Sequence, residues 1–236
     1  MINITQRLKE TAEKVLRKAK FFPAEKLEII GTYLDMKITG CERKDIKVRI
    51  VGKISKSEEH TYGMMEFVSN EGKLIIRNGY GMEMYPLNRL KLVVEVPKNM
   101  PVSIFSEGLA HLEISNMEAK VSLDLSDTFV NFSFSKDLEA KVCKQGKIIL
   151  TAVRAKNIKL NVNGRSQVDI QSGSVIDMLE ASIEASEVSS WGHLTEALVF
   201  ITGGGKLHIE KISKSPTIIT DEKFKNDVKI FKVGID

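Results

Sequence analysis

Cysteine, proline and tryptophan are scarce in this chain of 236 residues, which contains two cysteines, five prolines and one tryptophan. Cys41 and Cys143 lie too far apart to indicate the dense disulfide framework of a small secreted domain, so we expect free thiols in a reducing compartment. The start of the chain lacks the apolar run of a signal peptide, and no window approaches the roughly 18 apolar residues of a membrane span. The sequence therefore predicts a cytoplasmic protein without a transmembrane segment.

An excess of charge of one sign is also missing from most of the sequence. The formal net charge is +4, and residues 1–20 alone hold six basic and two acidic side chains, so the remainder is neutral. A protein that coats nucleic acid spreads its basic residues over a binding face. We therefore expect no specific binding of nucleic acid.

Helical periodicity is confined to the N-terminal segment. Over residues 4–20 the apolar side chains fall near one side and charged side chains cover the rest, until Pro23 ends the pattern. We expect an amphipathic helix within residues 1–22 that caps or docks onto the rest of the chain through Leu8, Val15 and Leu16. Residues 24–236 are expected to form one β domain.

Short alternations of apolar and polar residues repeat along the second half of the chain. Apolar pairs spaced two residues apart begin at fourteen positions, at a mean interval of about 9.7 residues. The starts are Val102, Leu112, Val121, Val130, Ala140, Ile148, Ile158, Val168, Met178, Val188, Leu198, Leu207, Ile218 and Val228. A period of one strand plus one turn is typical of an antiparallel sandwich or barrel, and also of a β-solenoid.

The turns favour the solenoid. Between Val102 and Phe200 there is no proline, and the breaks are built from Ser, Asn and isolated Gly, as in Asn163-Gly164. Such residues suit stacked corners better than hairpin turns. We therefore predict an all-β, single-domain β-solenoid of the right-handed β-helix type, preceded by the N-terminal helix. The predicted core contains Val121, Leu123, Val130, Phe132, Ile158, Leu160, Val168 and Ile170.

A family resemblance supports this fold. The segment LKLVVEVPKNMPVSI, residues 90–104, resembles the strand, Val-Pro-Lys and strand element that opens the repeats of the bacterial putative-adhesin families of unknown function. The alternating stretches at residues 34–38 and 45–50, followed by Gly52-Lys53, resemble the first strands of those families. The resemblance spans residues 27–236 and implies a β-solenoid with an adhesin-like role and no catalytic residues. Many relatives are exported or membrane-anchored, and this chain shows neither feature.

Signals for catalysis or metal binding are weak. Gly203-Gly204-Gly205-Lys206 lacks the helix and the Ser or Thr of a phosphate loop, and we interpret it as a corner. The four histidines show no metal-ligand spacing. Asp124 and Asp169 both point outward, but four to five repeats separate them, so they cannot act on one glycosidic bond. We expect no catalytic residue, no cofactor and no metal.

Charge segregates between consecutive repeats. Residues 140–168 contain seven basic residues and no acid, whereas residues 169–205 contain six acids and no Lys or Arg. If the repeats stack, these blocks become a basic band and an acidic band. The basic band could bind an anionic polymer, or the two bands of different molecules could associate, or both bands could be a solvated surface without a ligand. We expect Lys141, Lys156 and Lys159 to contact such a ligand. Trp191, alone among small residues, is the other expected ligand contact.

The sequence thus predicts a non-enzymatic β-solenoid scaffold or binding module, adhesin-like by resemblance. Two alternatives remain. A glycan-active enzyme on a β-helix would need a concave cleft with clustered carboxylates of perturbed pKa. A filament-forming structural protein would need unprotected coil ends.

Overall fold

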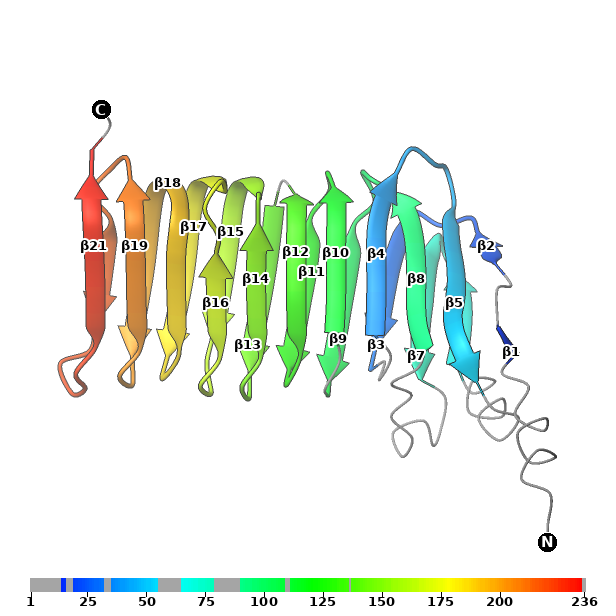
Figure 1. Ribbon diagram of the computed structural model, residues 1–236, viewed down its shortest axis with the longest axis horizontal. Helices are drawn as coiled ribbons and strands as arrows, with labels where there is room; N and C mark the ends of the chain where they lie inside the picture. The colour runs from blue at the N-terminus through cyan, green and yellow to red at the C-terminus, as the bar shows by residue number, and fades with distance from the viewer. Residues whose placement is uncertain are drawn as a thin grey trace, which may run out of the picture.

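The computed structural model describes residues 14–15, 19–31, 35–54, 65–78, 90–108, 111–135 and 137–234. All regular elements in these ranges are strands, and none of the described residues forms a helix that could cross a membrane. The strands lie side by side across a long rod, with the first strands at one end and the last strands at the other (Figure 1).

The strands form two stacks, here called sheet 1 and sheet 2, which enclose one continuous hydrophobic core. Sheet 1 contains, in spatial order, β1 (Lys14–Val15) and β2 (Lys20–Phe22), both paired with β5 (Ile46–Ile54), then β8 (Leu90–Pro97), β4 (Asp35–Cys41), β10 (His111–Met117), β12 (Phe129–Ser135), β14 (Lys147–Thr151), β16 (Gln167–Ile170), the first part of β18 (Glu187–Thr202), β19 (Lys206–Ile212) and β21 (Asp227–Val233). Sheet 2 contains β6 (Met65–Asn70), β7 (Lys73–Asn78), β3 (Lys26–Ile30), β9 (Val102–Glu107), β11 (Val121–Ser126), β13 (Asp137–Cys143), β15 (Arg154–Val162), β17 (Val175–Glu184), the second part of β18 and β20 (Thr217–Thr220).

The chain alternates between the two sheets, so two strands make one coil. From β9 onward each strand pairs in parallel with the next strand of its own sheet. Val130 pairs with Ile148, 18 residues later, and Ile158 pairs with Leu179, 21 residues later. The repeat of about ten residues is therefore half a coil, and the predicted β-solenoid is confirmed.

The first coils are wound differently. The coil of β3 and β4 lies between the coil of β7 and β8 and the coil of β9 and β10, although it precedes both in the sequence. Antiparallel pairs occur at this end, where β5 pairs with β8 and β6 pairs with β7.

The helix expected within residues 1–22 is wrong where the structure describes that segment. Lys14–Val15 and Lys20–Phe22 are strands, and both pair antiparallel with β5. The edge of β5 offers backbone N–H and C=O groups that need partners, and pairing with them outweighs a weak local preference for helix. The rest of the segment, including Leu8 and Leu16, lies outside the described residues.

The predicted core is confirmed. All eight of the residues named from the sequence are at most 3% exposed. Two of the fourteen predicted strand starts are out of phase by one residue, because Leu179 and Val199 are buried in place of Met178 and Leu198. Both errors fall in β17 and β18, where the strand runs round a corner and an additional residue shifts the alternation.

One corner repeats in successive coils and is built from small residues. The stacked positions are Thr128, Gly146, Ser166, Ser186 and Gly205, joined through backbone bonds such as Lys147 N–H to the Thr128 carbonyl at 2.9 Å. The residue before each has a left-handed backbone: Asp127, Gln145, Arg165, Ala185 and Gly204, with φ between 48° and 79°. A Cβ at Gly146 would lie 2.7 Å from Val142 Cγ1, so no side chain fits there unless its neighbour shifts. The corner expected at Gly203-Gly204-Gly205 is confirmed.

Candidate functional site

The outer face of sheet 2 carries an open groove that runs along the rod. Its volume is about 940 Å³, and its lining residues come from β3, β9, β11, β13, β15, β17 and β18. With about 4.8 Å between neighbouring strands, seven strands span about 29 Å. A groove of this length suits an extended chain better than a compact small molecule.

The groove has polar side chains along its length and large apolar side chains towards both ends. Ser122 on β11 and Ser182 on β17 are among the polar residues between the ends. Towards one end lie Phe105 on β9 and its partner Ile30 on β3, the strand that also carries Glu28, and at the other end lie Leu198 and Phe200 on β18. Phe105 and Phe200 are both exposed although they belong to strands, because they occupy the outward phase of the alternation. The ends of the groove therefore offer two apolar contacts.

The charged side chains of the groove occur as cross-strand pairs. Lys141 Nζ lies 3.3 Å from Asp124 Oδ2, and Lys159 Nζ lies 3.6 Å from Glu180 Oε2. The other two groove carboxylates, Glu139 and Glu28, pair with Lys120 and Lys73 at the rim. The hydrogen bond from Lys120 holds the pKa of Glu139 below its usual value. Four carboxylates thus face four lysines.

The structure divides the ligand contacts predicted from the sequence between two faces. Lys141 and Lys159 both line the groove. Lys156 is exposed on β15 but does not line the groove. Trp191 directly follows the residues of β18 that pair within sheet 1, and its ring stacks on His208 of β19, so it lies on the opposite side of the core from the groove. The sequence prediction missed Phe105 and the outward phase of Leu198 and Phe200, because the latter pair was assigned to the core.

Trp191 begins a ladder of three aromatic rings on sheet 1. Its ring centroid lies 4.3 Å from that of His208 on β19, which in turn lies 4.8 Å from that of Phe231 on β21. Trp191 and Phe231 are exposed, as the sequence suggested for Trp191. His208 Nε2 is buried, lies 3.9 Å from Glu210 Oε2 and makes no hydrogen bond within the described part of the chain. The ladder is a second surface with which a ligand could stack.

The basic and acidic bands are neighbours within one chain, where lysines of one pair with acids of the other. Lys147 on β14 lies 3.3 Å from Asp169 on β16, and Lys159 pairs with Glu180 in the other sheet. Residues at the boundary between the bands therefore neutralise each other across neighbouring strands.

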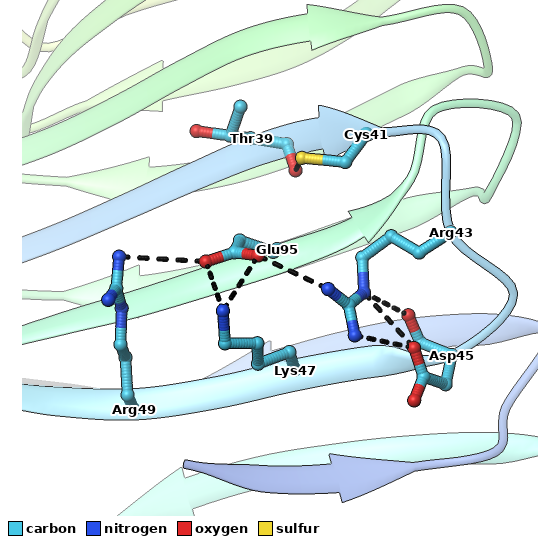
Figure 2. Close-up of polar contacts among 7 residues, drawn as sticks. All are labelled: Thr39, Cys41, Arg43, Asp45, Lys47, Arg49 and Glu95. Atoms are coloured by element: carbon cyan, nitrogen blue, oxygen red, sulfur yellow. Dashed lines mark hydrogen bonds and ion pairs between the residues drawn. The ribbon is translucent and has the colours of Figure 1, made fainter. Parts of the chain in front are cut away.

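A polar cluster surrounds Glu95, which points outward from β8 of sheet 1 between buried Val94 and Val96; Figure 2 shows its contacts. Lys47 Nζ donates to both carboxylate oxygens of Glu95, at 3.0 and 3.1 Å, and Arg43 Nη1 donates at 3.3 Å. Arg49 Nη2 lies 3.5 Å from the same carboxylate. Lys47 and Glu95 are direct partners in the antiparallel pairing of β5 and β8. The cluster therefore stabilises the pairing of β5 with β8, and no ligand is needed to explain it.

Cys41 lies beside this cluster, in surroundings that disfavour its thiolate form. Burial, and then the negative charge of Glu95, raise the pKa of its thiol above the usual value. A reactive cysteine needs the opposite shift, because the thiolate is the nucleophile. Cys41 and Cys143 are both free thiols, as expected from the sequence.

Replacing Glu95 with glutamine is expected to lower the free energy of unfolding by about 1.5 kcal/mol at pH 7. The hydrogen bond from Lys47 lowers the folded-state pKa of Glu95. Its contribution is therefore complete above the ordinary glutamate pKa of about 4.3 and is lost as the pH falls toward the lowered value. Urea unfolding of the wild type and Glu95→Gln at pH 7 and pH 3.5 measures this.

The difference in the free energy of unfolding between the wild type and Glu95→Gln should be smaller at pH 3.5 than at pH 7. An equal difference at both pH values would contradict the prediction. The control is Glu66→Gln. Glu66 pairs with Arg77 at 2.6 Å, but both side chains are about half exposed, so its removal should cost at most about 0.5 kcal/mol.

Within the described ranges, no three His, Cys, Asp or Glu side chains are grouped so that they could hold a metal ion.

Comparison with known proteins finds likeness in structure only. No family model matches the sequence. No curated protein matches it either. Among solved structures, a "putative adhesin" from Parabacteroides distasonis is 9% identical, with a TM-score of 0.57 over 93% of this chain and 98% of that chain. A "putative adhesin" from Bacteroides fragilis is 15% identical, with a TM-score of 0.56 over 95% and 99% of the two chains.

A "putative lipid binding protein" from Parabacteroides distasonis is 14% identical, with a TM-score of 0.52 over 92% of this chain and 95% of that chain. At sequence identities this low, the comparison shows a similar backbone fold and says nothing about a shared binding site. The chain therefore has the β-solenoid fold of these bacterial proteins.

Proposed function

We propose that the chain is a non-enzymatic binding module that holds an extended acidic polymer in the groove of sheet 2. The observation that carries the proposal is the groove itself, open and about 940 Å³ in volume, with Lys141 and Lys159 in its lining. The solved structures of the same fold include two that are each described as a "putative adhesin", which supports a binding role.

Lys141 and Lys159 supply the cationic contacts of the proposed site. Their present partners, Asp124 and Glu180, are partly exposed, and exposed ion pairs contribute only about 0–1 kcal/mol. An acidic group of a ligand can therefore compete with either carboxylate for its lysine. Phe105 and Phe200 then pack against the less polar parts of the polymer at the two ends.

The pKa of one groove carboxylate, that of Glu139, does not suit it to glycan cleavage. A glycosidase needs one carboxyl group whose pKa is raised, so that it can donate a proton near neutral pH. The pKa of Glu139 is shifted the other way, because Lys120 donates a hydrogen bond to it. Glu139 therefore stays ionised and is a poor general acid.

Reversing both groove lysines, Lys141→Glu with Lys159→Glu, is expected to weaken binding of heparin or polygalacturonate oligosaccharides at least tenfold. The matched control is Lys156→Glu, which reverses an exposed lysine of the same band outside the groove and should change affinity less than twofold. Titration calorimetry at 0.1 M and 1 M salt measures both effects. Binding should weaken with salt, because the screening length falls from about 10 Å to about 3 Å.

Tryptophan fluorescence shows which face is occupied, because Trp191 is the only tryptophan and lies across the core from the groove. A ligand in the groove should leave its emission unchanged. If the emission of Trp191 changes with ligand and still does so in the Lys141→Glu, Lys159→Glu double variant, the ligand lies on the aromatic ladder instead. Absence of binding to both polymers at low salt would contradict the proposed function.

A further inference from the structure

Asn161 occupies a central position in the groove of sheet 2. It is exposed on β15 and belongs to the lining of the groove. Its partner on the neighbouring strand β13 is Lys141, and its partner on β17 is Ser182. Lys159 precedes it by two residues on the same strand, so both side chains point outward. All three neighbours of Asn161 also line the groove.

These four side chains can all donate hydrogen bonds to a ligand. Because strands lie about 4.8 Å apart and rise about 3.3 Å per residue, the backbones of Lys141 and Ser182 lie about 4.8 Å from that of Asn161, and that of Lys159 about 6.6 Å. Within the described part of the chain, neither the Asn161 amide nor the Ser182 hydroxyl makes a hydrogen bond. Two neutral donors are therefore free beside two cations.

Both lysines keep donors for a ligand while they are paired with carboxylates. Lys141 pairs with Asp124, its register partner on the side away from Asn161, at 3.3 Å. Lys159 pairs with Glu180 at 3.6 Å. A lysine ammonium has three N–H donors, so one carboxylate does not occupy it fully.

The carboxylates of the lining restrict which anion fits beside Asn161. Glu139 and Glu180 are its diagonal neighbours, one strand away and two residues along, which places their backbones about 8 Å from it. Both repel an anion, and they repel a phosphate monoester, with a charge of roughly −1.5 to −2 at pH 7, more than a singly charged sulfate ester. A carboxylate is also singly charged, but it offers two oxygens where an ester sulfate offers three.

We propose that the groove recognises a sulfate ester of its polymer, in a subsite centred on Asn161. Lys141, Asn161 and Ser182 come from three neighbouring strands, so each can donate to a different sulfate oxygen. Lys159 adds a second positive charge. This inference rests on the proposed function, because it names the acidic group that the groove holds.

The row of side chains through Asn161 has room for one such subsite. Beyond Lys141 the row continues to Asp124, which repels a second sulfate. Beyond Ser182 it continues to Phe200, whose ring has no donor and suits a less polar part of the polymer.

Titration calorimetry with heparin oligosaccharides and with the same oligosaccharides after chemical desulfation tests the subsite. The desulfated form keeps the sugar chain and its carboxylates, and we expect it to bind at least about tenfold more weakly. Asn161→Ala and Ser182→Ala should each weaken heparin binding about fivefold, because each removes a hydrogen bond to a charged group. Binding of the desulfated form should change less than about twofold in either variant.

Two matched controls separate the subsite from the rest of the surface. Asn157→Ala replaces an exposed asparagine of the same strand that does not line the groove. Ser122→Ala replaces a groove serine whose partner on β13 is the carboxylate Glu139. Neither should change the ratio of the two affinities.

Equal affinities of the wild type for the two forms would overturn the sulfate subsite and leave the proposed function in place. A ratio unchanged in both Asn161→Ala and Ser182→Ala, or one lost in Asn157→Ala, would do the same. If the wild type binds neither form at low salt, the proposed function fails and this inference fails with it.

Discussion

Replacing Phe132 with alanine is expected to lower the free energy of unfolding by about 3–5 kcal/mol. Phe132 is completely buried and is one of the largest side chains in the core. Its partners on the neighbouring strands of sheet 1 are Ile114 and Leu150, which are also buried, so packed side chains flank the cavity that the ring would leave. The cost should therefore include the cavity as well as the lost burial of the ring.

Chemical denaturation followed by circular dichroism measures this loss. Phe200→Ala is the matched control, because Phe200 belongs to a strand but faces outward and is exposed. The free energy of unfolding of Phe200→Ala should fall by less than about 1 kcal/mol, as for other surface replacements. A loss below about 1 kcal/mol for Phe132→Ala would mean that the assigned alternation is wrong.

Gly40→Ala is expected to destabilise the protein by about 3 kcal/mol, the upper part of the usual range for overpacking. A Cβ at Gly40 would lie 2.0 Å from the carbonyl oxygen of Asn116 and 3.1 Å from Lys98 Cα. Both are backbone atoms, so no side-chain rotation relieves the clash. Asn116 is also hydrogen-bonded to this glycine, since Asn116 Nδ2 donates to the Gly40 carbonyl at 2.7 Å.

The control for this variant is Gly173→Ala. Gly173 has a φ of +88°, but nothing lies within 4 Å of the position of its Cβ. Its replacement should cost only the backbone strain, about 1 kcal/mol. Thermal unfolding of the two variants separates steric overlap from strain. Equal shifts in melting temperature would contradict the close contact between Gly40 and the backbone of Asn116.

The fold could be predicted because its signals are local. Alternation places Val121 and Leu123 inward without knowledge of the neighbouring coil, and small residues such as Ser166 mark the corners. The number of strands per coil could not be predicted, because it depends on which strands pair. The match of Val130 with Ile148 is a contact between distant residues that no local pattern contains. The N-terminal helix was wrong for the same reason, since β5 supplies partners for Lys20–Phe22 from elsewhere in the chain.

The candidate site was predictable in part. Lys141 and Lys159 have the outward phase and lie in alternate repeats, which a solenoid with two strands per coil places on the same sheet. Trp191 follows a repeat of the other parity, so it faces the opposite side. The acidic partners Asp124 and Glu180 come from neighbouring coils, and only the strand register reveals them. Phe200 was missed because an apolar residue in a strand was taken as core.

The ligand face is tested most directly by an amide chemical-shift titration of the ¹⁵N-labelled protein with the acidic oligosaccharides. We predict shift changes confined to the groove strands of sheet 2, around residues 122–124, 139–141, 159–161 and 180–182, and absent in the Lys141→Glu, Lys159→Glu double variant. Shifts confined to Trp191, His208 and Phe231, or no shifts at all, would contradict binding in the groove.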